Sequence, residues 1–228
     1  QPHICYCHSP MRYAWDMREE YLREAGIATG LRGWLARFVL ERLRRWDLRN
    51  SAGVSQFIAN SGFIAERIRI SYGRDATVIY PPVDTEYFTP GGEKDDFYLA
   101  ASRFVPYKRM NLIVQAFSRM PEKRLVVIGD GPQYETARAN AGPNVEFLGY
   151  QPRDVMRDSL RRARAFVFAA KEDFGILPVE AQACGTPVIA YGAGGALETV
   201  RGIGSVGSER PTGVFFETQT EEALIAAV

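Results

Sequence analysis

The stretch Glu172-Asp173-Phe174-Gly175-Ile176-Leu177-Pro178-Val179-Glu180 places two carboxylates eight positions apart around a glycine that opens a helix. The preceding run Phe166-Val167-Phe168 is typical of a buried strand, and Pro178 suits the first residue of the following helix, where a missing N–H costs nothing. A helix N-terminus beside a glycine is a suitable site for a pyrophosphate. The stretch therefore predicts a strand, a ligand-binding loop and a helix.

The two carboxylates of this stretch allow two interpretations. Glu180, expected in the first helical turn, can accept hydrogen bonds from two adjacent ribose hydroxyls, and Glu172, at the strand end, can reach a hydroxyl-rich sugar. Alternatively, Glu180 only complements the helix dipole and Glu172 is a solvated loop residue. The spacing alone does not separate these interpretations.

A second strand, loop and helix lies upstream and carries two cations. The loop Ser102-Arg103-Phe104-Val105-Pro106-Tyr107-Lys108-Arg109 follows the apolar run 97–101 and precedes a helical pattern over 111–117. Arg103 is expected at the carboxyl end of a strand, which is where open α/β sheets bind ligands. Lys108 is expected at a helix start, where a cation is disfavoured unless an anion lies beside it. This loop therefore favours a phosphate site.

A third loop of the same kind, Gly129-Asp130-Gly131-Pro132, follows the apolar run Val126-Val127-Ile128. Its two glycines permit a tight turn close to a ligand. A Gly-x-Gly pair alone is weak evidence, because it is more often a plain turn.

The order of these motifs resembles the carboxyl-terminal domain of retaining glycosyltransferases of family 4. The resemblance covers nearly all of residues 97–217 and rests on Ser-Arg-x5-Lys, Gly-Asp-Gly-Pro, Val-Glu-Phe-Leu-Gly-Tyr, Glu-x7-Glu and Ala-Cys-Gly-Thr-Pro-Val-Ile-Ala. The opening segment 7–16, Cys-His-Ser-Pro-Met-Arg-Tyr-Ala-Trp-Asp, and the linker 80–84, Tyr-Pro-Pro-Val-Asp, are similar to a mannosyltransferase-like branch that makes surface polysaccharides.

The resemblance implies an α/β fold of the GT-B type, in which two Rossmann-like domains face each other and the second holds the nucleotide-sugar. It implies that Arg103 and Lys108 neutralise the donor pyrophosphate, that Glu172 contacts the donor sugar and that His8 lies near that sugar; these four are the expected catalytic residues. The donor-binding residues that it implies are Gly129, Gly131, Tyr150 beside the base, Asp173, Phe174, Gly175, Ile176, Leu177 and the ribose ligand Glu180.

The implied chemistry is retaining transfer of a hexose without a metal or another cofactor. Arg103, Lys108 and the amides of the Gly175 loop would stabilise the charge on the departing nucleoside diphosphate. Glu172 is interpreted as orienting sugar hydroxyls rather than as a nucleophile. The donor expected from the branch is GDP-mannose, with UDP- and ADP-sugars as alternatives, and the acceptor is a saccharide or a lipid-linked saccharide.

Composition and length agree with an α/β protein of two parts. The chain has 228 residues, 46% of them hydrophobic, and a formal net charge of +1, which gives no general attraction to nucleic acid. We expect a partial amino-terminal domain with its linker over 1–90 and a complete nucleotide-sugar-binding domain over 91–228, joined through the Pro- and Gly-rich segment 81–92. Because the first strands of the family pattern are absent and the chain stops inside a helical run, the sequence is interpreted as a fragment.

The number of cysteines and the lengths of the apolar runs indicate the cellular compartment of the protein. Three cysteines, an odd number, with Cys184 on a helix that is predicted to be buried, favour a reducing cytoplasm. Cys5, Cys7 and His8 lack the spacing and the fourth ligand of a metal site. No apolar run reaches the ~20 residues that span a bilayer.

The segment 31–50 is predicted to form a basic helix. Apolar residues recur at helical spacing between six arginines, and two of them are Trp34 and Trp46. Such a helix can lie on an anionic membrane at the inner face of the cell, which would suit a lipid-linked acceptor. The favoured interpretation is a helix that packs on the core and exposes a solvated basic face.

Two other functions stay open at this point. A nucleotide-sugar epimerase, or a phosphorylase of similar architecture, could share the two-domain layout, although no pyridoxal-bearing lysine is identified. The other possibility is a nucleotide-sugar-binding module that binds its ligand without catalysing a reaction.

Overall fold

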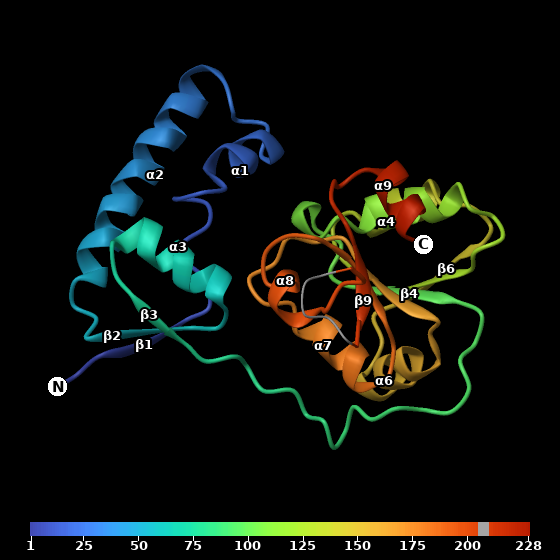
Figure 1. Ribbon diagram of the computed structural model, residues 1–228. Coiled ribbons are helices and arrows are strands. Elements are labelled where there is room, and N and C mark those ends of the chain that lie inside the picture. Colours follow the sequence, from blue (N-terminus) through green and yellow to red (C-terminus); the bar gives the residue numbers. More distant parts are fainter. Residues whose placement is uncertain (205–209) are drawn as a thin grey trace. The chain divides into compact units, whose positions relative to one another are not determined.

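The computed structural model describes residues 1–204 and 210–228, which form two compact units, Gln1–Pro81 and Pro82–Val228 (Figure 1). Each unit combines a parallel sheet with helices that connect its strands. This alternation is the pattern that the spacing of apolar runs predicts.

The first unit is built on a parallel sheet with the order β1-β2-β3. Its elements are β1 (Ile4–Cys7), α1 (Arg18–Glu24), α2 (Gly30–Ser51), β2 (Gln56–Ala59), α3 (Gly62–Tyr72) and β3 (Ala76–Val78). Ser61 is the N-cap of α3, since its hydroxyl accepts a hydrogen bond of 3.1 Å from the backbone N–H of Ile64. Side chains of Phe57, Ile64 and Ile68 fill a small core.

Helix α2 does not bury its apolar residues as the favoured interpretation of the sequence requires. Its inward side contacts the unit through polar groups: Asp47 accepts hydrogen bonds of 2.8 Å from Trp15 Nε1 and from the Tyr72 hydroxyl. Trp34 and Phe38 are therefore left on the outward side and are exposed. Among the helices of residues 1–204 and 210–228, none is long and apolar enough to cross a membrane.

Residues 82–90, which the sequence assigns to the first part, pack on the second unit. Phe88 is buried in a core cluster of that unit, and Arg161 Nε donates a hydrogen bond of 2.8 Å to the Thr89 carbonyl. Contacts thus divide the chain after Pro81, at the start of the segment 81–92 that the composition marks as the break.

The second unit contains a parallel sheet with the order β6-β5-β4-β7-β8-β9. In chain order its elements are β4 (Tyr98–Ala101), the 3-10 helix η1 (Pro106–Lys108), α4 (Met110–Ser118), β5 (Leu125–Ile128), α5 (Tyr134–Ala139), β6 (Val145–Gly149), α6 (Arg153–Arg162), β7 (Ala165–Phe168), α7 (Ile176–Ala183), β8 (Val188–Tyr191), α8 (Ala196–Thr199), β9 (Gly213–Phe216) and α9 (Glu221–Ala227). This order is that of a doubly wound, Rossmann-like sheet.

Alternate residues of each central strand enter two separate cores. Tyr98 and Ala100 of β4 pack with α4 and α9 on one face, whereas Leu99 and Ala101 pack with α6 and α7 on the other (Figure 1). Strands covered on both faces need apolar residues at every position, which explains the uninterrupted apolar runs.

Helix α7 begins two residues earlier than the sequence analysis expects. Its first residue is Ile176 and its N-cap is Gly175, whose φ of 81° lies in the left-handed region. Pro178 is consequently the third helical residue, where its N–H would still lack an intrahelical acceptor. Glu180 then lies beyond the first turn, so that the dipole interpretation of this carboxylate loses its geometric basis.

Candidate nucleotide-sugar site

The predicted site residues of the second unit gather where its order of strands reverses. Strands β4 and β7 are neighbours although β5 and β6 separate them in the chain, so the connections from β4 and β7 leave in opposite directions. Open α/β sheets bind ligands in the crevice that this reversal creates at the carboxyl ends of the strands. The loop after β4 carries Arg103 and Lys108, and the loop after β7 carries Glu172.

Lys108 and Glu172 are brought into direct contact across the switch point. The ammonium nitrogen Nζ of Lys108 donates to Glu172 Oε1, and each side chain is only 18% exposed. The partners are 64 positions apart in the sequence, so the pair depends on the pairing of β4 with β7. The site therefore contains one cation and one carboxylate in mutual contact and largely shielded from solvent.

This pair changes the argument that the sequence offers for Lys108. The residue ends η1 rather than starting α4, and its neighbouring anion is the carboxylate of Glu172. The charge of Lys108 is thus compensated within the chain, and its position does not by itself require a phosphate.

A pocket of about 290 Å³ lies beside the β4 loop and combines residues from several loops. Four residues of the predicted site contribute to it, namely Arg103, Gly129, Tyr150 and Leu177. The other lining residues are Ala101, Ser102, Ile128, Asp130, Gln151 and Met156. An exposed aromatic ring, that of Tyr150, together with the apolar side chains of Met156 and Leu177 offers flat and apolar surface for a nucleotide base.

The two glycines of the β5 loop are required by contacts between loops. A Cβ atom on Gly129 would lie 1.9 Å from the carbonyl oxygen of Ser102, and one on Gly131 would lie 2.8 Å from that of Phe104. Both glycines also have φ above 130°, where other residues are strained. The glycines thus allow the β5 loop to lie against the β4 loop, so that Asp130 and Arg103 line the same pocket.

Glu180 of α7 is half-buried and accepts no hydrogen bond at its carboxylate from the described residues. Burial raises the pKa of Glu180 above its ordinary value, and the positive charge of Arg153 acts in the opposite direction. A partly desolvated carboxylate without a donor is suited to accept hydrogen bonds from ligand hydroxyls.

The loop before α7 is held by a glycine pair that the sequence analysis does not single out. Gly195 N donates a hydrogen bond of 2.8 Å to the carbonyl of Glu172, and Gly194 forms a parallel bridge with Glu172. A Cβ on Gly195 would lie 2.4 Å from the Cα of Phe174, whose ring is buried. Two adjacent glycines shortly after β8 were the available signal, because such a pair permits close backbone approach.

A second residue missed in the sequence, Gln219, fixes the start of the same loop. Its side-chain Nε2 donates a hydrogen bond of 2.8 Å to the carbonyl of Ala169, directly after β7. Gln219 lies between β9 and α9, 50 positions away, and nothing in its local sequence predicts this contact.

His8 lies in the first unit, where it directly follows β1 and is exposed. Its ring meets that of Tyr6 edge to face with centroids 5.2 Å apart. Its expected proximity to the donor sugar stays a prediction. No group of three or more His, Cys, Asp or Glu side chains within residues 1–204 and 210–228 is placed to hold a metal ion, and Cys5, Cys7 and the buried Cys184 are free thiols.

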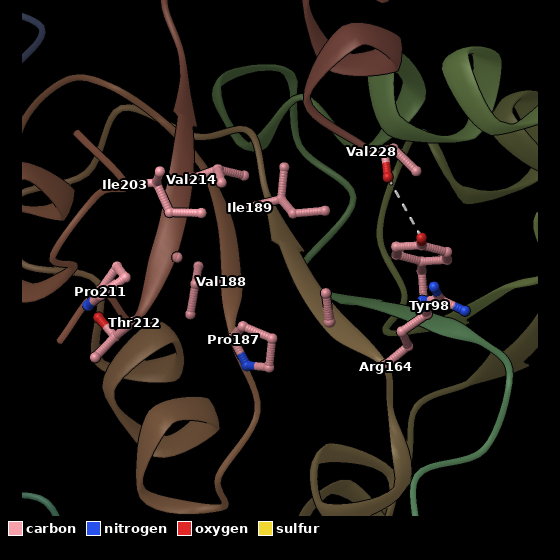
Figure 2. A pocket seen from close by; sticks show the side chains of 12 residues that line it. Tyr98, Arg164, Pro187, Val188, Ile189, Ile203, Pro211, Thr212, Val214 and Val228 are labelled. Carbon is pink, nitrogen blue, oxygen red and sulfur yellow. Dashed lines mark hydrogen bonds between the residues drawn. The ribbon is translucent and has the colours of Figure 1, made fainter.

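Another pocket, of about 280 Å³, lies at the amino ends of strands of the second sheet (Figure 2). Tyr98, Ala165, Val188 and Gly213, which line it, are the first residues of β4, β7, β8 and β9. The Tyr98 hydroxyl donates to the carbonyl oxygen of Val228 across this pocket at 3.5 Å. Because it lies at the amino ends of the strands, this pocket is separate from the switch-point site.

Comparison with known proteins decides the family. Residues 86–228 match the family described as glycosyl transferases group 1. The chain belongs to this family. The match includes the pocket, the Lys108–Glu172 pair and Glu180, so that the whole switch-point site lies inside the glycosyltransferase domain.

Curated relatives of this glycosyltransferase chain act on two kinds of substrate, as their names state. A GDP-mannose-dependent monoacylated alpha-(1-6)-phosphatidylinositol monomannoside mannosyltransferase of Corynebacterium glutamicum is 30% identical over an alignment of 171 positions that covers 61% of this chain and 45% of that protein. A D-inositol 3-phosphate glycosyltransferase of Mycobacteroides abscessus is 32% identical over an alignment of 173 positions that covers 66% of this chain and 38% of that protein. The chain thus spans about half or less of the length of these relatives.

Solved structures confirm the predicted α/β fold of the GT-B type. The Anabaena protein Alr3699/HepE, solved in complex with UDP and glucose, has a TM-score of 0.65 and 20% identity over 91% of this chain and 64% of its own. Sucrose-phosphate synthase from Thermosynechococcus elongatus has a TM-score of 0.67 and 24% identity over 80% of this chain and 51% of its own.

Proposed function

We propose that this chain binds a nucleotide-sugar at the switch point of its second unit and that its protein transfers the sugar, with mannose as the expected hexose, to a saccharide or lipid-linked acceptor. The observation that carries the proposal is the combination of the Lys108–Glu172 pair with the pocket lined by Arg103 and Tyr150 at one switch point. A cation, a carboxylate and a pocket for a base match the phosphate, sugar and base of one donor.

Each group of the site has a distinct part in this proposal. Tyr150, Met156 and Leu177 contact the base, and Glu180 accepts hydrogen bonds from the ribose hydroxyls. Arg103, Lys108 and the first amides of α7, which lack intrahelical acceptors, bind the diphosphate. Glu172 orients the hydroxyls of the sugar.

The proposed reaction is a substitution at the anomeric carbon with retention. The bond between that carbon and the diphosphate oxygen breaks, and its electron pair leaves with the diphosphate. The acceptor oxygen forms the new bond from the same face, and its proton passes to the departing phosphate. Arg103 and Lys108 stabilise the charge that grows on the leaving group, so their loss lowers turnover more than donor affinity.

GDP-mannose is the donor that two observations favour. The linker and opening motifs resemble a mannosyltransferase-like branch, and the name of the Corynebacterium glutamicum relative states GDP-mannose dependence. The Anabaena neighbour was solved with UDP, which keeps UDP-sugars as the alternative.

Isothermal titration of the chain with GDP, UDP, ADP and their sugar conjugates tests the proposal. We expect selective binding of GDP-mannose and at least tenfold weaker binding by Lys108→Gln, because a charge-assisted phosphate contact contributes about 1.5 to 3 kcal/mol. Lys123→Gln is the matched control, since Lys123 lies just before β5, at the amino ends of the strands and away from the switch point. Binding of none of the nucleotides, or equal loss in the control, would overturn the assignment.

Product analysis separates the proposal from its two rivals. Transfer of radiolabelled mannose from GDP-mannose to an added saccharide or lipid-linked acceptor supports a transferase. Conversion of the nucleotide-sugar to an epimer without an acceptor would identify an epimerase. Binding without hydrolysis or transfer would leave a nucleotide-sugar-binding module.

A further inference from the structure

Helix α2 has an outward side whose composition changes along its length. The inward side is fixed by the hydrogen bonds of Asp47 and by Gly33, where a Cβ atom would lie 2.7 Å from the carbonyl oxygen of Ile27. Positions three, four and seven residues apart share one side of a helix. The residues on the opposite side therefore face away from the unit.

The amino-terminal half of this side is apolar and exposed. Its members are Leu31, Trp34, Leu35, Phe38 and Val39, of which Leu31 is 80% and Trp34 is 64% exposed. The rings of Trp34 and Phe38 stack with centroids 5.9 Å apart, so that they form one continuous surface. A contiguous exposed patch of large apolar side chains marks an interaction surface.

The carboxyl-terminal half of the same side is basic. Arg42, Arg45 and Arg49 line, together with Leu48, a depression of about 460 Å³. Arg45 pairs with Glu41 at 3.2 Å, whereas Arg42 and Arg49 form no ion pair with a described carboxylate. Positive charge in excess of its partners thus lies directly after the apolar patch.

We propose that this side of α2, residues 31–49, docks on an anionic lipid surface. The apolar half enters the boundary between headgroups and acyl chains, and the three arginines contact lipid phosphates. Charge complementarity favours anionic lipid as the partner of this surface. Arg42 and Arg49 lack carboxylate partners among the described residues, and anionic lipid provides phosphate at high density. Exposed tryptophan beside arginine is typical of helices that lie in the plane of a membrane. The inference goes beyond donor binding and does not depend on it.

Co-sedimentation with vesicles tests the charged half of this proposal. We expect binding to vesicles of phosphatidylcholine with 30% phosphatidylglycerol, and a roughly 100-fold weaker partition for the triple variant Arg42→Gln, Arg45→Gln, Arg49→Gln, because each basic residue near such a surface contributes about fivefold. The control is Arg124→Gln, Arg138→Gln, Arg162→Gln, three exposed arginines of the second unit whose loss changes the net charge equally. Equal loss in both triple variants, or equal binding to pure phosphatidylcholine, would overturn the proposal.

The depth of tryptophan side chains in the lipid bilayer tests the apolar half of this surface. In variants that keep only Trp34 or only Trp46, with the other tryptophans replaced by phenylalanine, brominated lipids should quench Trp34 more strongly, since it belongs to the apolar half. Trp34→Ser with Phe38→Ser should abolish binding while leaving circular dichroism and nucleotide titration unchanged. A mass that doubles with concentration and returns to the monomer value in this variant, without vesicle binding, would instead assign the surface to a second copy of the chain.

Discussion

At the scale of single residues, the pair of Lys108 and Glu172 sets up a competition. If donor phosphate and Glu172 both approach the ammonium group of Lys108, the two negative groups repel each other. Glu172→Gln should then strengthen binding of GDP about tenfold, because it removes a repulsion on the order of 1 to 2 kcal/mol. The same variant should lose the added affinity that the mannose moiety gives GDP-mannose over GDP. Isothermal titration measures the dissociation constants of both GDP and GDP-mannose.

The control for this variant is Glu146→Gln, which removes an exposed carboxylate that pairs with Arg124 at 2.7 Å away from the switch point. Exposed pairs contribute little, so the control should bind as the unaltered chain does. Weaker GDP binding in Glu172→Gln would contradict the competition and indicate that the carboxylate holds Lys108 in position for the phosphate.

Glu180 gives a second prediction at the residue scale, with opposite effects on stability and binding. Burial raises its pKa in the folded state, so the folded chain binds the proton more tightly and the ionised carboxylate lowers stability once the pH rises through that pKa. Glu180→Gln should therefore unfold at higher urea concentration at pH 7. The difference should vanish below about pH 4, where the carboxyl group is protonated in both states.

The same Glu180→Gln variant should bind GDP-mannose more weakly, since a ribose hydrogen-bond acceptor is lost. Glu135→Gln, an exposed carboxylate on α5, should change neither quantity. If Glu180→Gln is less stable at pH 7, the carboxylate has a donor in the folded chain and the assigned role fails.

At the scale of elements, the loop after β8 supports the loop that carries Glu172. Gly195→Ala should lower donor affinity and destabilise the second unit by about 1 to 3 kcal/mol, because its Cβ would meet the backbone of Phe174 at 2.4 Å. The φ of Gly195 is −63°, so steric contact and not backbone strain is the cause. Gly92→Ala is the control, since nothing lies within 4 Å of its Cβ. If Gly195→Ala changes neither the donor affinity nor the urea midpoint, the loops after β7 and β8 can move apart without cost and the prediction fails.

Elements were predictable where a local pattern defines them. Uninterrupted apolar runs indicated the buried strands, glycines marked the loops, and the helical run expected at the end of the chain is α9 (Glu221–Ala227). The strand reversal that unites the β4 and β7 loops is a property of the sheet, and the pairing of Lys108 with Glu172 follows from it over 64 positions. The contact of Gln219 with Ala169 likewise spans 50 positions and depends on the order β7-β8-β9 in the sheet. No local signal encodes such distances.

Helix α2 shows the opposite case, in which a local pattern suggested the wrong packing. Helical spacing of apolar residues predicts a buried side, yet Asp47, with hydrogen bonds from Trp15 and Tyr72, provides the inward contact. Periodicity cannot distinguish an aspartate in a partly buried polar contact of this kind from a solvated one. The apolar residues thus became an outward surface.

At the scale of the whole molecule, the two units have separate cores, and all three tryptophans, Trp15, Trp34 and Trp46, lie in the first. Tryptophan fluorescence therefore reports the first unit during urea unfolding, whereas circular dichroism reports both. Ile68→Ala, in the core of the first unit, should destabilise that unit by about 2 to 5 kcal/mol and move the fluorescence midpoint.

Donor binding should stabilise the second unit and shift its unfolding transition to higher urea concentration. GDP-mannose at a hundredfold excess over its dissociation constant adds about 2.7 kcal/mol to the unit that binds it. If the second unit alone provides the site, the donor shifts the unfolding of that unit, which is the part of the circular dichroism transition that Ile68→Ala does not move. The midpoint of the fluorescence transition, which reports the first unit, then stays unchanged. A donor-dependent shift of the fluorescence midpoint would contradict this and would show that the first unit, in which His8 is the expected contributor, shares in binding the donor.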